Sequence, residues 1–574
     1  MVARSAWIVD RSEATSRRGM VAAKTGFAAD AGAEALERGG NAIDAAVTAG
    51  LTAWVVEPWM NGIGGGGFIV AHFPAHQESV VVEFPMISPA AATPDMFTLA
   101  GAGTDDALFG WPAVTGNENV VGHKSAAVPG AVAGLALALD RFGTISFAEA
   151  LAPAVRYAEE GFPIEWNASH YISRDFANLK RFPATAEVFL DSTGNPPFSP
   201  EGTPVFLRQP NLAQTLRTLA DEGPRTFYEG ELARRITAHL ADNGAPLTTE
   251  DLAGYDARIS KPIVAGYRDH QVLTIGSGTG GTTLAQSLNI LDQTTVSGLG
   301  HNSPQALHAM AQAFRLAFAD RYAYLADPDK IEVPIEAMLS TDYLAARATL
   351  IQSGNFDGVL PGSKEQLGVS HDMPGSLPEY IGSGCTTHIS AIDGSGNAVS
   401  LTQTLLSAWG SRVVVPGTGV LLNNGMMWFD PVPGRPNSVG GNQRPLSNMS
   451  PAIVLRDGRP LAALGASGGR RILNCVAQLV FNLVDHGMTM QPAVSAPRID
   501  ASTPELLVSD RFPLDTQHAL RDLGHQVVSR DEQDFHGDFA SPACVQLGQD
   551  GMFRGGVDPY YRPATATGVP AVTA

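Results

Sequence analysis

Thr386 is the residue whose surroundings best suit chemistry, and it follows the flexible run Gly382-Ser383-Gly384-Cys385. A threonine hydroxyl is a weak nucleophile that needs a base. A free α-amino group on the same residue can supply one, because its pKa of about 7.7 to 8.0 leaves much of it neutral near physiological pH. That amine exists only after the bond between Cys385 and Thr386 is cut. The sequence therefore predicts a nucleophile that the chain exposes by cleaving itself.

A second candidate nucleophile is Ser467, because the run Gly465-Ala466-Ser467-Gly468-Gly469 matches the GxSxG elbow of serine hydrolases. A strand-like segment, 461–464, precedes the run, and a helix-like segment, 472–484, follows it. The acids and histidines that could complete a Ser-Asp-His order are Asp485, Asp500, His518 and His525. The alternative is a tight glycine turn that buries Ser467, and the local sequence leaves both interpretations open.

Two further glycine-rich runs loosely match phosphate-binding patterns. The run 62–67 is followed by the strand-like segment 68–73, whereas a dinucleotide site needs a helix there. The run 276–281 lies between a strand-like and a helix-like segment, but it lacks the lysine of a full phosphate loop and a following acid for a ribose. The scattered histidines have no metal-binding spacing. We therefore expect neither a cofactor nor a metal.

The residues after Thr386 predict a β-hairpin. Thr386 to Asp393 alternates as a strand, residues 394–397 form a Gly-Ser-Gly-Asn turn, and Ala398 to Leu405 returns as the second strand. If Asp393 pairs near Ala398, Thr386 lies opposite Thr404 within about one residue of register, which places a second hydroxyl beside the nucleophile. On propensity alone, these would be ordinary strand threonines.

Other elements must frame this hairpin. Helical patterns cover 28–38 and 41–55, and strand patterns cover 68–73 and 80–84. Ser303-Pro304 opens another helix, whose core-facing stripe contains Leu307, Met310, Phe314 and Phe318. Residues 354–384 lack sustained periodicity, so we expect an exposed connector there.

Composition narrows the class of protein. The 574 residues are 44% hydrophobic and 17% charged, with 61 glycines and 39 prolines, which is typical of a globular enzyme with many turns. A net charge of −19 without a dense Lys/Arg run argues against nucleic acid. The chain lacks the roughly 18 consecutive apolar residues that span a membrane, and residues 1–20 lack an apolar signal core. Three widely spaced cysteines predict reduced thiols, and we expect a cytoplasmic protein.

Taken together, the motifs resemble the gamma-glutamyltransferase (gamma-glutamyltranspeptidase) family of the Ntn-hydrolase superfamily over nearly the whole chain. Those similar to its small subunit are Thr386-Thr387-His388, Asp393-Gly394, Gly396-Asn397-Ala398-Val399, Thr404, Leu421-Leu422-Asn423-Asn424, Arg444-Pro445-Leu446-Ser447, Met449-Ser450-Pro451 and Gly468-Gly469. Those similar to its large subunit are 39–46, 64–68, Pro129-Gly130, Ala319-Asp320-Arg321, Tyr324-Leu325 and Asp327-Pro328.

This resemblance implies an α+β fold, the four-layer αββα sandwich of the N-terminal nucleophile hydrolases, made as one precursor and cut before Thr386. Residues 1–385 would form the large-subunit segment and 386–574 the small-subunit segment, paired as a heterodimer or as a heterotetramer of two such pairs. By the same resemblance, Thr404 is a supporting hydroxyl, and Gly468 and Gly469 supply the N–H groups that stabilise an oxyanion. Asn423 and Asn424 would flank the site.

Several positions depart from the family pattern for a glutamyl donor. Pro85 stands where the family has a carboxylate-binding Arg, and Leu406 where it has an Asn two residues past Thr404. Gly425 replaces the Gln or Glu after the paired asparagines, and Trp428 replaces the amine-binding Asp. Of a pair of serines, Ser447 stays and the second is Asn448. These losses remove the partners that a zwitterionic donor needs when it leaves water. Trp428 and Leu406 instead offer an apolar wall.

We therefore expect a self-processing amidohydrolase or acylase that hydrolyses a non-glutamyl, small-molecule amide through an acyl-Thr386 intermediate, similar to the family's acylase and amidohydrolase branches. An anionic substrate stays open, because four arginines can approach the pocket, although surface pairing is the simpler role for each: Arg412, Arg444, Arg470 and Arg471. The alternatives are a true gamma-glutamyltransferase or glutathione hydrolase, a serine hydrolase using Ser467, and a non-catalytic binding protein that kept the fold.

Overall fold

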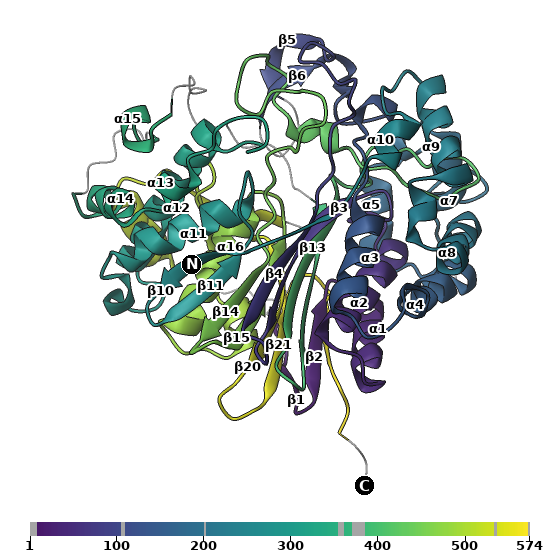
Figure 1. Cartoon of the computed structure of the whole chain (residues 1–574). Helices are drawn as coiled ribbons and strands as arrows, with labels where there is room; N and C mark the ends of the chain where they lie inside the picture. Colours follow the sequence, from purple (N-terminus) through teal and green to yellow (C-terminus); the bar gives the residue numbers. More distant parts are fainter. Residues whose placement is uncertain are drawn as a thin grey trace, which may run out of the picture.

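Two stacked β-sheets with helices on both outer faces form the fold (Figure 1). The computed structural model describes residues 9–104, 110–199, 203–353, 361–369, 385–532 and 537–571. The two sheets face each other through β12 against β20, β2 against β21 and β13 against β15. The predicted four-layer αββα sandwich is confirmed.

The first sheet has seven strands, and neighbours pair antiparallel throughout. In spatial order the strands are β22 (Thr565–Gly568), β2 (Gly19–Ala23), β12 (Cys385–Asp393), β13 (Ala398–Leu406), β3 (Gly66–Phe73), β4 (Glu78–Phe84) and β9 (Arg258–Ser260). Three helices cover its outer face: α1 (Gly26–Glu37), α2 (Ala42–Val56) and α3 (Ala131–Phe142).

The second sheet has eight strands. In spatial order seven of them are β1 (Ala14–Ser16), β21 (Phe553–Val557), β20 (Ser541–Leu547), β15 (Arg459–Leu464), β14 (Ala452–Arg456), β11 (His270–Thr274) and β10 (Ile263–Tyr267), and β16 (Ala466–Ser467) also pairs with β20. Its outer face carries α11 (Gly280–Asp292), α16 (Arg471–Val484) and α17 (Met490–Ser495), and α12 (Pro304–Tyr324) packs on α11. Each sheet contains strands from both sides of the Cys385–Thr386 bond.

Local sequence explains the helix pair beneath the first sheet. Asn41 caps α2 by accepting from the amide of Asp44 at 3.1 Å, while the Asp44 carboxylate accepts from the amide of Asn41 at 2.7 Å. A Cβ on Gly32 in α1 would lie 2.8 Å from the carbonyl oxygen of Ala45, so only glycine permits this close approach of the two helices. All residues of α2 are buried, which explains its unbroken apolar run.

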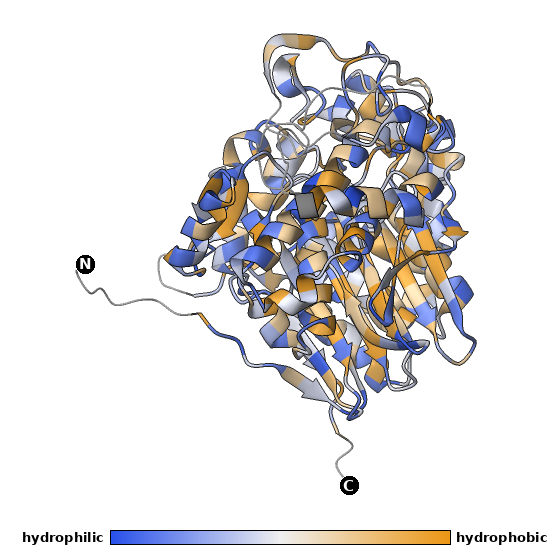
Figure 2. Cartoon of the chain, turned by 90° about the vertical axis from the view of Figure 1, so that its left-hand side faces the viewer, coloured by the Kyte–Doolittle hydropathy of each residue, from blue (hydrophilic) through white to orange (hydrophobic). Residues whose placement is uncertain are grey.

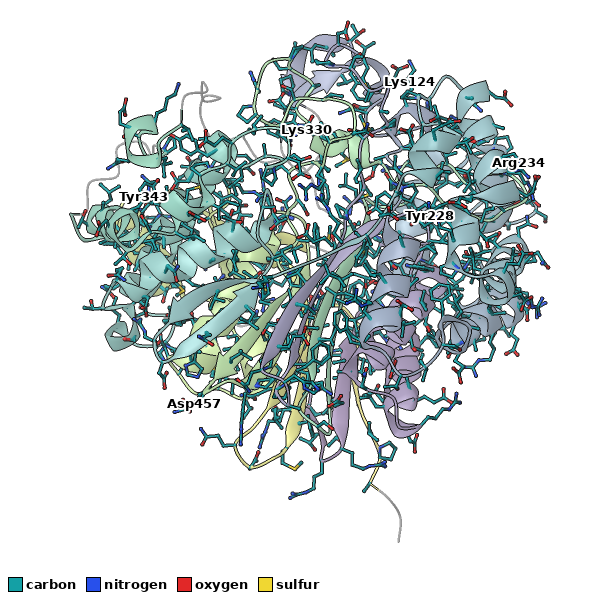
Figure 3. All side chains as sticks on the ribbon, in the orientation of Figure 1. Lys124, Tyr228, Arg234, Lys330, Tyr343 and Asp457 are labelled. Carbon is teal, nitrogen blue, oxygen red and sulfur yellow. The ribbon has the colours of Figure 1, made fainter. Side chains whose placement is uncertain are left out.

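The predicted hairpin is present as β12 and β13, and it is buried on both faces. Orange, hydrophobic strands lie inside the molecule in Figure 2, and side chains fill the space between the layers in Figure 3, where Arg234 and Asp457 reach the periphery. The Asp393 carboxylate accepts from the amides of Ser395 and Asn397 at 2.9 and 3.0 Å, and this closes the turn. Because side chains alternate along a strand, even-numbered residues of β12 face one way and odd-numbered residues the other.

The even-numbered side chains line a polar seam between the two sheets. His388 bonds to Thr402 at 2.8 Å and to Ser390 at 3.0 Å, and the Ser390 hydroxyl donates to the carbonyl of Ala543 in the facing sheet at 2.9 Å. Burial lowers the pKa of His388 to about 3, so its imidazole is neutral. The strand threonines of this seam are therefore part of a hydrogen-bonded layer that joins the sheets.

The helix after Ser303 and the connector 354–384 are two further predictions from the sequence. The helix predicted after Ser303 is α12, capped by the Ser303 hydroxyl, and its predicted stripe is buried together with Asp320 and Arg321. The predicted connector 354–384 lies mostly outside the described residues, although α15 (Lys364–Leu367) forms within the described stretch 361–369. In the part of the chain that the structure describes, no helix combines the length and apolar character of a membrane span.

Candidate active site

The peptide bond before Thr386 is surrounded by hydroxyl groups. Thr386 Oγ1 donates to the carbonyl oxygen of Cys385 at 2.7 Å. Thr404, across the hairpin, donates to the same oxygen at 2.5 Å and accepts from the amide of Leu406 at 2.8 Å. Both threonines are buried. The Cys385 carbonyl, whose carbon would be attacked in a cut before Thr386, is thus polarised by two hydroxyls.

The hairpin departs from regular pairing at this point. Cys385 pairs with Leu406 and Thr387 with Gln403, so a register shift falls on Thr386 and places it across from Thr404, as the sequence predicts. Leu406 has a φ of +97°, a value that residues other than glycine rarely adopt. Because the regular ladder is interrupted here, the Cys385 carbonyl accepts hydroxyl groups.

Gly468 and Gly469 lie at the start of α16, directly after β16, which packs against β12. Their φ values of +140° and +63° lie in the region that favours glycine, and a Cβ on Gly468 would come within 2.8 Å of the Ala540 backbone. Their amide N–H groups make no hydrogen bond to another described residue. Free N–H groups at the start of a 14-residue helix are suited to stabilising an oxyanion.

Ser467 forms no triad with any of the four partners that the sequence offered, so this form of the serine-hydrolase alternative is contradicted. Its hydroxyl is buried and donates to the backbone carbonyl of Ser541 at 3.4 Å. The candidate partners are engaged elsewhere or exposed: Asp485 binds Tyr267 and Arg268, Asp500 binds Asn474 and Ser502, His525 binds His308 and Arg315, and His518 lies exposed on α18 (Leu514–Asp522). The tight-turn interpretation of this glycine run holds.

Position 425 has no room for the family's Gln or Glu. A Cβ on Gly425 would lie 2.8 Å from the Cβ of Ala127 and 3.1 Å from that of Met86. The Asn423 side chain ties this corner together, because its Oδ1 accepts from the amides of Gly425 at 2.8 Å and Ala127 at 3.0 Å. Neighbouring Asn424 accepts from the amide of Ser407 at 3.1 Å, which fixes the end of β13.

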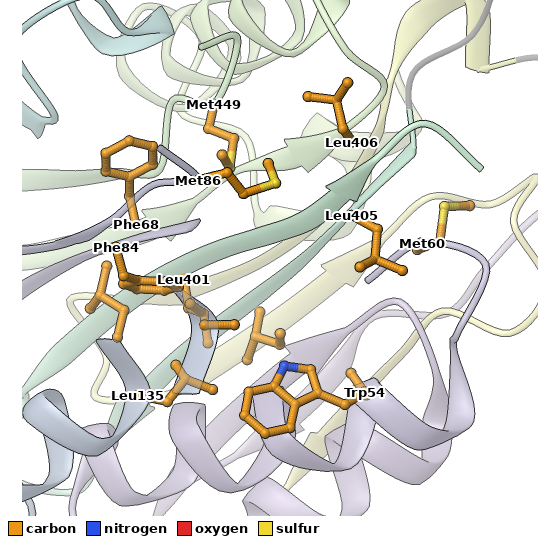
Figure 4. Packing of buried hydrophobic residues seen from close by; sticks show 14 of the residues in the cluster. Trp54, Met60, Phe68, Phe84, Met86, Leu135, Leu401, Leu405, Leu406 and Met449 are labelled. Atoms are coloured by element: carbon orange, nitrogen blue, oxygen red, sulfur yellow. The ribbon is translucent and has the colours of Figure 1, made fainter. Parts of the chain in front are cut away.

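The other altered positions are buried and carry no charged side chain. Trp428 is buried, and its carbonyl accepts from Asn437 Nδ2 at 2.6 Å. Pro85 is buried, and its carbonyl accepts from the hydroxyl of Tyr255 at 2.6 Å. Figure 4 places Leu406 with Met86 and Met449 on one side of β13, opposite to Leu401, Leu405 and Trp54. We call the set Pro85, Met86, Ala127, Leu406, Gly425 and Trp428 the apolar wall.

Ser447 and Asn448 are held by Arg321, a residue to which the sequence analysis assigned no role. The buried Arg321 guanidinium donates to the carbonyl of Ser447 at 2.6 Å and to Asn448 Oδ1 at 2.9 Å. Burial lowers the pKa of Arg321 to about 10. The Ala-Asp-Arg motif within an apolar helix was the available signal, because a buried charge needs fixed partners.

Three of the four arginines expected near the pocket pair with acids, and the paired side chains named here are largely shielded from solvent. Arg412 pairs with Asp175 at 2.6 Å, Arg444 with Asp327 at 2.8 Å, and Arg471 with Asp538 at 3.0 Å. Arg470 is buried beside Gly469. The paired guanidiniums already have carboxylate partners, which weakens the argument for an anionic substrate from these residues.

A buried acid and a buried base behind the hairpin were also missed. Glu57 ends α2, and its carboxylate accepts from the Thr387 hydroxyl at 2.5 Å. Burial raises the pKa of Glu57 to about 7, and burial lowers the pKa of Lys24 to about 8. The signal in the sequence was a single charge at the end of each of two segments without other charged residues, 19–24 and 45–57.

The remaining glycine runs serve packing. A Cβ on Gly65 would lie 2.3 Å from the carbonyl oxygen of Thr404, and one on Gly67 equally close to that of Thr402, so the run 62–67 lets β3 approach β13. A Cβ on Gly280 would lie 2.5 Å from the carbonyl oxygen of Asn448. Within the described ranges, no group of three His, Cys, Asp or Glu side chains is placed to hold a metal ion.

Comparisons with known proteins identify the family of the chain. The family model described as Gamma-glutamyltranspeptidase matches residues 28–566. The chain is 37% identical over 524 residues to the Acylase ACY 1 proenzyme of Pseudomonas sp. (strain V22), covering 90% of this chain and 89% of that protein. It is 34% identical over 520 residues to the Glutathione hydrolase proenzyme of Bacillus subtilis (strain 168), covering 88% and 85%.

A solved structure extends the comparison to three dimensions. The crystal structure of cephalosporin acylase from Bacillus halodurans matches with a TM-score of 0.84 and 26% identity, covering all of this chain and 99% of that one. Acylases and glutathione hydrolases are thus both among the relatives at similar identity. Overall similarity alone does not choose between their substrates, and the choice depends on the residues of the site.

Proposed function

Because the chain belongs to the gamma-glutamyltranspeptidase family, we propose that it is a self-processing amidohydrolase that cuts itself before Thr386 and hydrolyses a non-glutamyl amide. The observation that carries the proposal is the Cys385 carbonyl, which accepts from the hydroxyls of both Thr386 and Thr404. A strand threonine with an ordinary structural role has no need of a second hydroxyl on the carbonyl before it.

In the processing step, Thr386 Oγ1 attacks the Cys385 carbonyl carbon, and the bond between that carbon and the Thr386 nitrogen breaks. The product is an ester with a free α-amine, and water hydrolyses the ester to leave a carboxylate on Cys385. Thr404 stabilises the negative charge that develops on the carbonyl oxygen, because it already donates to that atom.

In the substrate reaction, the free amine of Thr386 takes the proton of its own hydroxyl while the oxygen attacks the substrate's amide carbonyl. The N–H groups of Gly468 and Gly469 stabilise the oxyanion. The amine product leaves with a proton, and water then releases the acid from the acyl-Thr386 ester. The amide bond is thereby hydrolysed in two steps.

The apolar wall supports an acyl group other than glutamyl. A glutamyl donor carries a carboxylate and an ammonium, and each needs a charged partner when it leaves water. Positions 85, 425 and 428 offer a proline, a glycine without space for a side chain, and a buried tryptophan. An uncharged or only singly charged acyl group fits this wall better.

The two segments, 1–385 and 386–574, would remain together after the cut. Each sheet interleaves strands of both segments, so separation would break hydrogen-bond ladders in the middle of both sheets. A heterodimer is therefore the expected product of processing.

A denaturing gel with N-terminal sequencing tests the proposal, followed by assays with a panel of simple acyl 4-nitroanilides and gamma-glutamyl 4-nitroanilide. We expect two fragments, the smaller beginning at Thr386, and hydrolysis of a simple acyl anilide. An uncut, inactive chain would contradict the mechanism. Preferred hydrolysis of the glutamyl anilide would support the glutathione hydrolase alternative instead.

A further inference from the structure

A buried carboxylate and a buried ammonium lie close to the hairpin, the carboxylate on its helix-facing side and the ammonium towards the second sheet. Thr387 points to the helix layer, where Glu57 accepts its hydroxyl at 2.5 Å. The other Glu57 oxygen accepts from the hydroxyl of Tyr561 at 3.2 Å, which in turn accepts from Trp59 Nε1 at 3.3 Å. Glu57 is fully buried. This carboxylate therefore binds the residue directly after the proposed nucleophile.

Lys24 lies on the other side of Tyr561. Its ammonium is 3.5 Å from the centroid of the Tyr561 ring and donates to the hydroxyl of Ser541. Ser541 pairs with Ser467 in β16, the residue before Gly468. Lys24 is 1% exposed. The ammonium thus binds β20, the neighbour of the strand that precedes the two glycines, while the carboxylate binds the strand of Thr386.

We propose that Glu57 and Lys24 are positioning residues for the Thr386 reaction, and that their opposite charges together set the protonation of the amine that processing releases. This inference rests on the proposed function, since the amine exists only in the cut chain. A negative charge nearby favours the protonated amine and a positive charge the neutral one, so the two effects oppose each other. Together they keep a share of the amine neutral, as proton transfer from the Thr386 hydroxyl requires.

The other ionisable groups around this pair are few enough to name. Asp558, Arg11, Glu57 and Cys385 act on Lys24, and Lys24 in turn acts on His388. The charged groups that act on Cys385 are Glu57, Arg174, Arg412 and Asp175, and Tyr171 lies near Cys385 and Glu57. Burial holds the Cys385 thiol and the Tyr561 phenol in their neutral forms by raising the pKa of each. Glu57 and Lys24 are the charged groups that contact the hairpin side of Tyr561 directly.

The test is the acidic limb of kcat/KM against pH, measured on the processed enzyme with the acyl 4-nitroanilide that the wild type hydrolyses fastest in a panel from acetyl to octanoyl. Glu57→Gln should move the limb to lower pH and Lys24→Met should move it to higher pH, each by about half a unit to one unit. Lys24→Arg, which keeps the charge, should leave the limb near its wild-type position.

Asp485→Asn is the matched control. Asp485 is also a buried carboxylate that accepts a tyrosine hydroxyl, at 2.6 Å from Tyr267, but it lies at the end of α16 outside the second sheet. Its removal should change stability without moving the limb. If Glu57→Gln and Lys24→Met shift the limb in the same direction or leave it in place, the proposal is overturned.

Failures of the two proposals are distinguishable. A wild-type chain that stays uncut, or that hydrolyses no anilide of the panel, contradicts the proposed function. A cut and active wild type with unmoved variants contradicts only the role of Glu57 and Lys24. If Glu57→Gln folds but is not cut, the expected shift of the acidic limb to higher pH in Lys24→Met tests the proposal by itself. Should neither variant fold, as judged by thermal melting, the pair is structural and the proposal fails.

Discussion

The hairpin of Thr386 and the apolar wall are held in different ways. Around the hairpin, hydroxyl and backbone groups converge on one carbonyl, and the register of β12 against β13 places them there. In the apolar wall, the shape is set by the neighbours that leave no space for a Cβ at Gly425 and by the burial of Trp428. Under the proposed function, the hydrogen bonds of the hairpin would serve the reaction and the packing of the wall would select the acyl group.

The largest effect should come from Thr386, the proposed nucleophile. Thr386→Ala should give an uncut chain whose amidase activity falls by about 10⁴-fold or more, because both reactions lose their attacking oxygen. Thr386→Ser, which keeps a hydroxyl, should still be cut. Gel analysis and anilide hydrolysis check both variants. A cut Thr386→Ala chain would place the nucleophile elsewhere and break the comparison.

Thr404→Val should slow self-cleavage by about 10²-fold to 10³-fold, the usual cost of losing one oxyanion donor. Thr402→Val is the control on the same face of the same strand, because its hydroxyl bonds to His388 and not to the scissile carbonyl. The time course of fragment appearance after synthesis measures both rates. Equal slowing in the two variants would mean that the hairpin, and not the Thr404 hydroxyl, limits the cut.

Glu57, which binds the hairpin, should also make the free energy of unfolding depend on pH. The altered positions of the apolar wall have no titratable side chain and should have no such effect. Burial raises the pKa of Glu57 from 4.5 to about 7, so the folded chain keeps a proton that the unfolded chain has released. The associated stability is full below pH 4.5 and is lost as the pH rises through 7. In the uncut Thr386→Ala background, the free energy of unfolding relative to the same chain with Glu57→Gln should fall by about 3 kcal/mol across that window.

Denaturant unfolding at pH 4 and pH 8 measures this difference. The pKa of Lys24 is lowered from 10.5 to about 8, so this ammonium stays charged across most of the same window and loses its proton only towards the upper end. If the difference in unfolding free energy between the two chains grows with pH, Glu57 is ionised across the whole window and the prediction is wrong.

In the wall, Gly425→Gln should destabilise the chain by about 1 to 3 kcal/mol, because the new Cβ overpacks against Ala127. Adding Ala127→Gly should recover part of the loss. Chemical unfolding of the single and double variants checks the coupling. If Gly425→Gln is neutral, the wall is looser than the packing indicates, and restoring the family's residue becomes a route to glutamyl hydrolysis.

The smallest effect should be on specificity. Trp428→Leu should lower kcat/KM for apolar acyl anilides by about tenfold, the scale of one altered hydrophobic contact, while self-cleavage stays normal. Trp166→Leu, at a tryptophan that is 40% exposed, is the control. Slower cleavage in Trp428→Leu would mean that the wall and the hairpin act as one unit.

Sequence reasoning succeeded where a short segment contains its own constraints. The alternation of 386–393 and 398–405 predicted the hairpin and the opposition of Thr386 and Thr404, because strand periodicity and a tight turn fix the register. It overvalued the GxSxG run, since that pattern specifies a backbone turn but not the partners of Ser467. It missed Glu57 and Lys24 because nothing near either residue in sequence indicates what it contacts.

The sequence by itself determined which threonine follows the proposed cut, which hydroxyls share a strand face, and which charges of the family pattern are missing from positions 85, 425 and 428. Those properties follow from covalent order and from the period of a strand. Only the tertiary structure decided that Ala127 fills the space at Gly425 and that Glu57 bonds to Thr387, 330 positions away. Such contacts arise when separate layers pack against each other, and no local pattern encodes them.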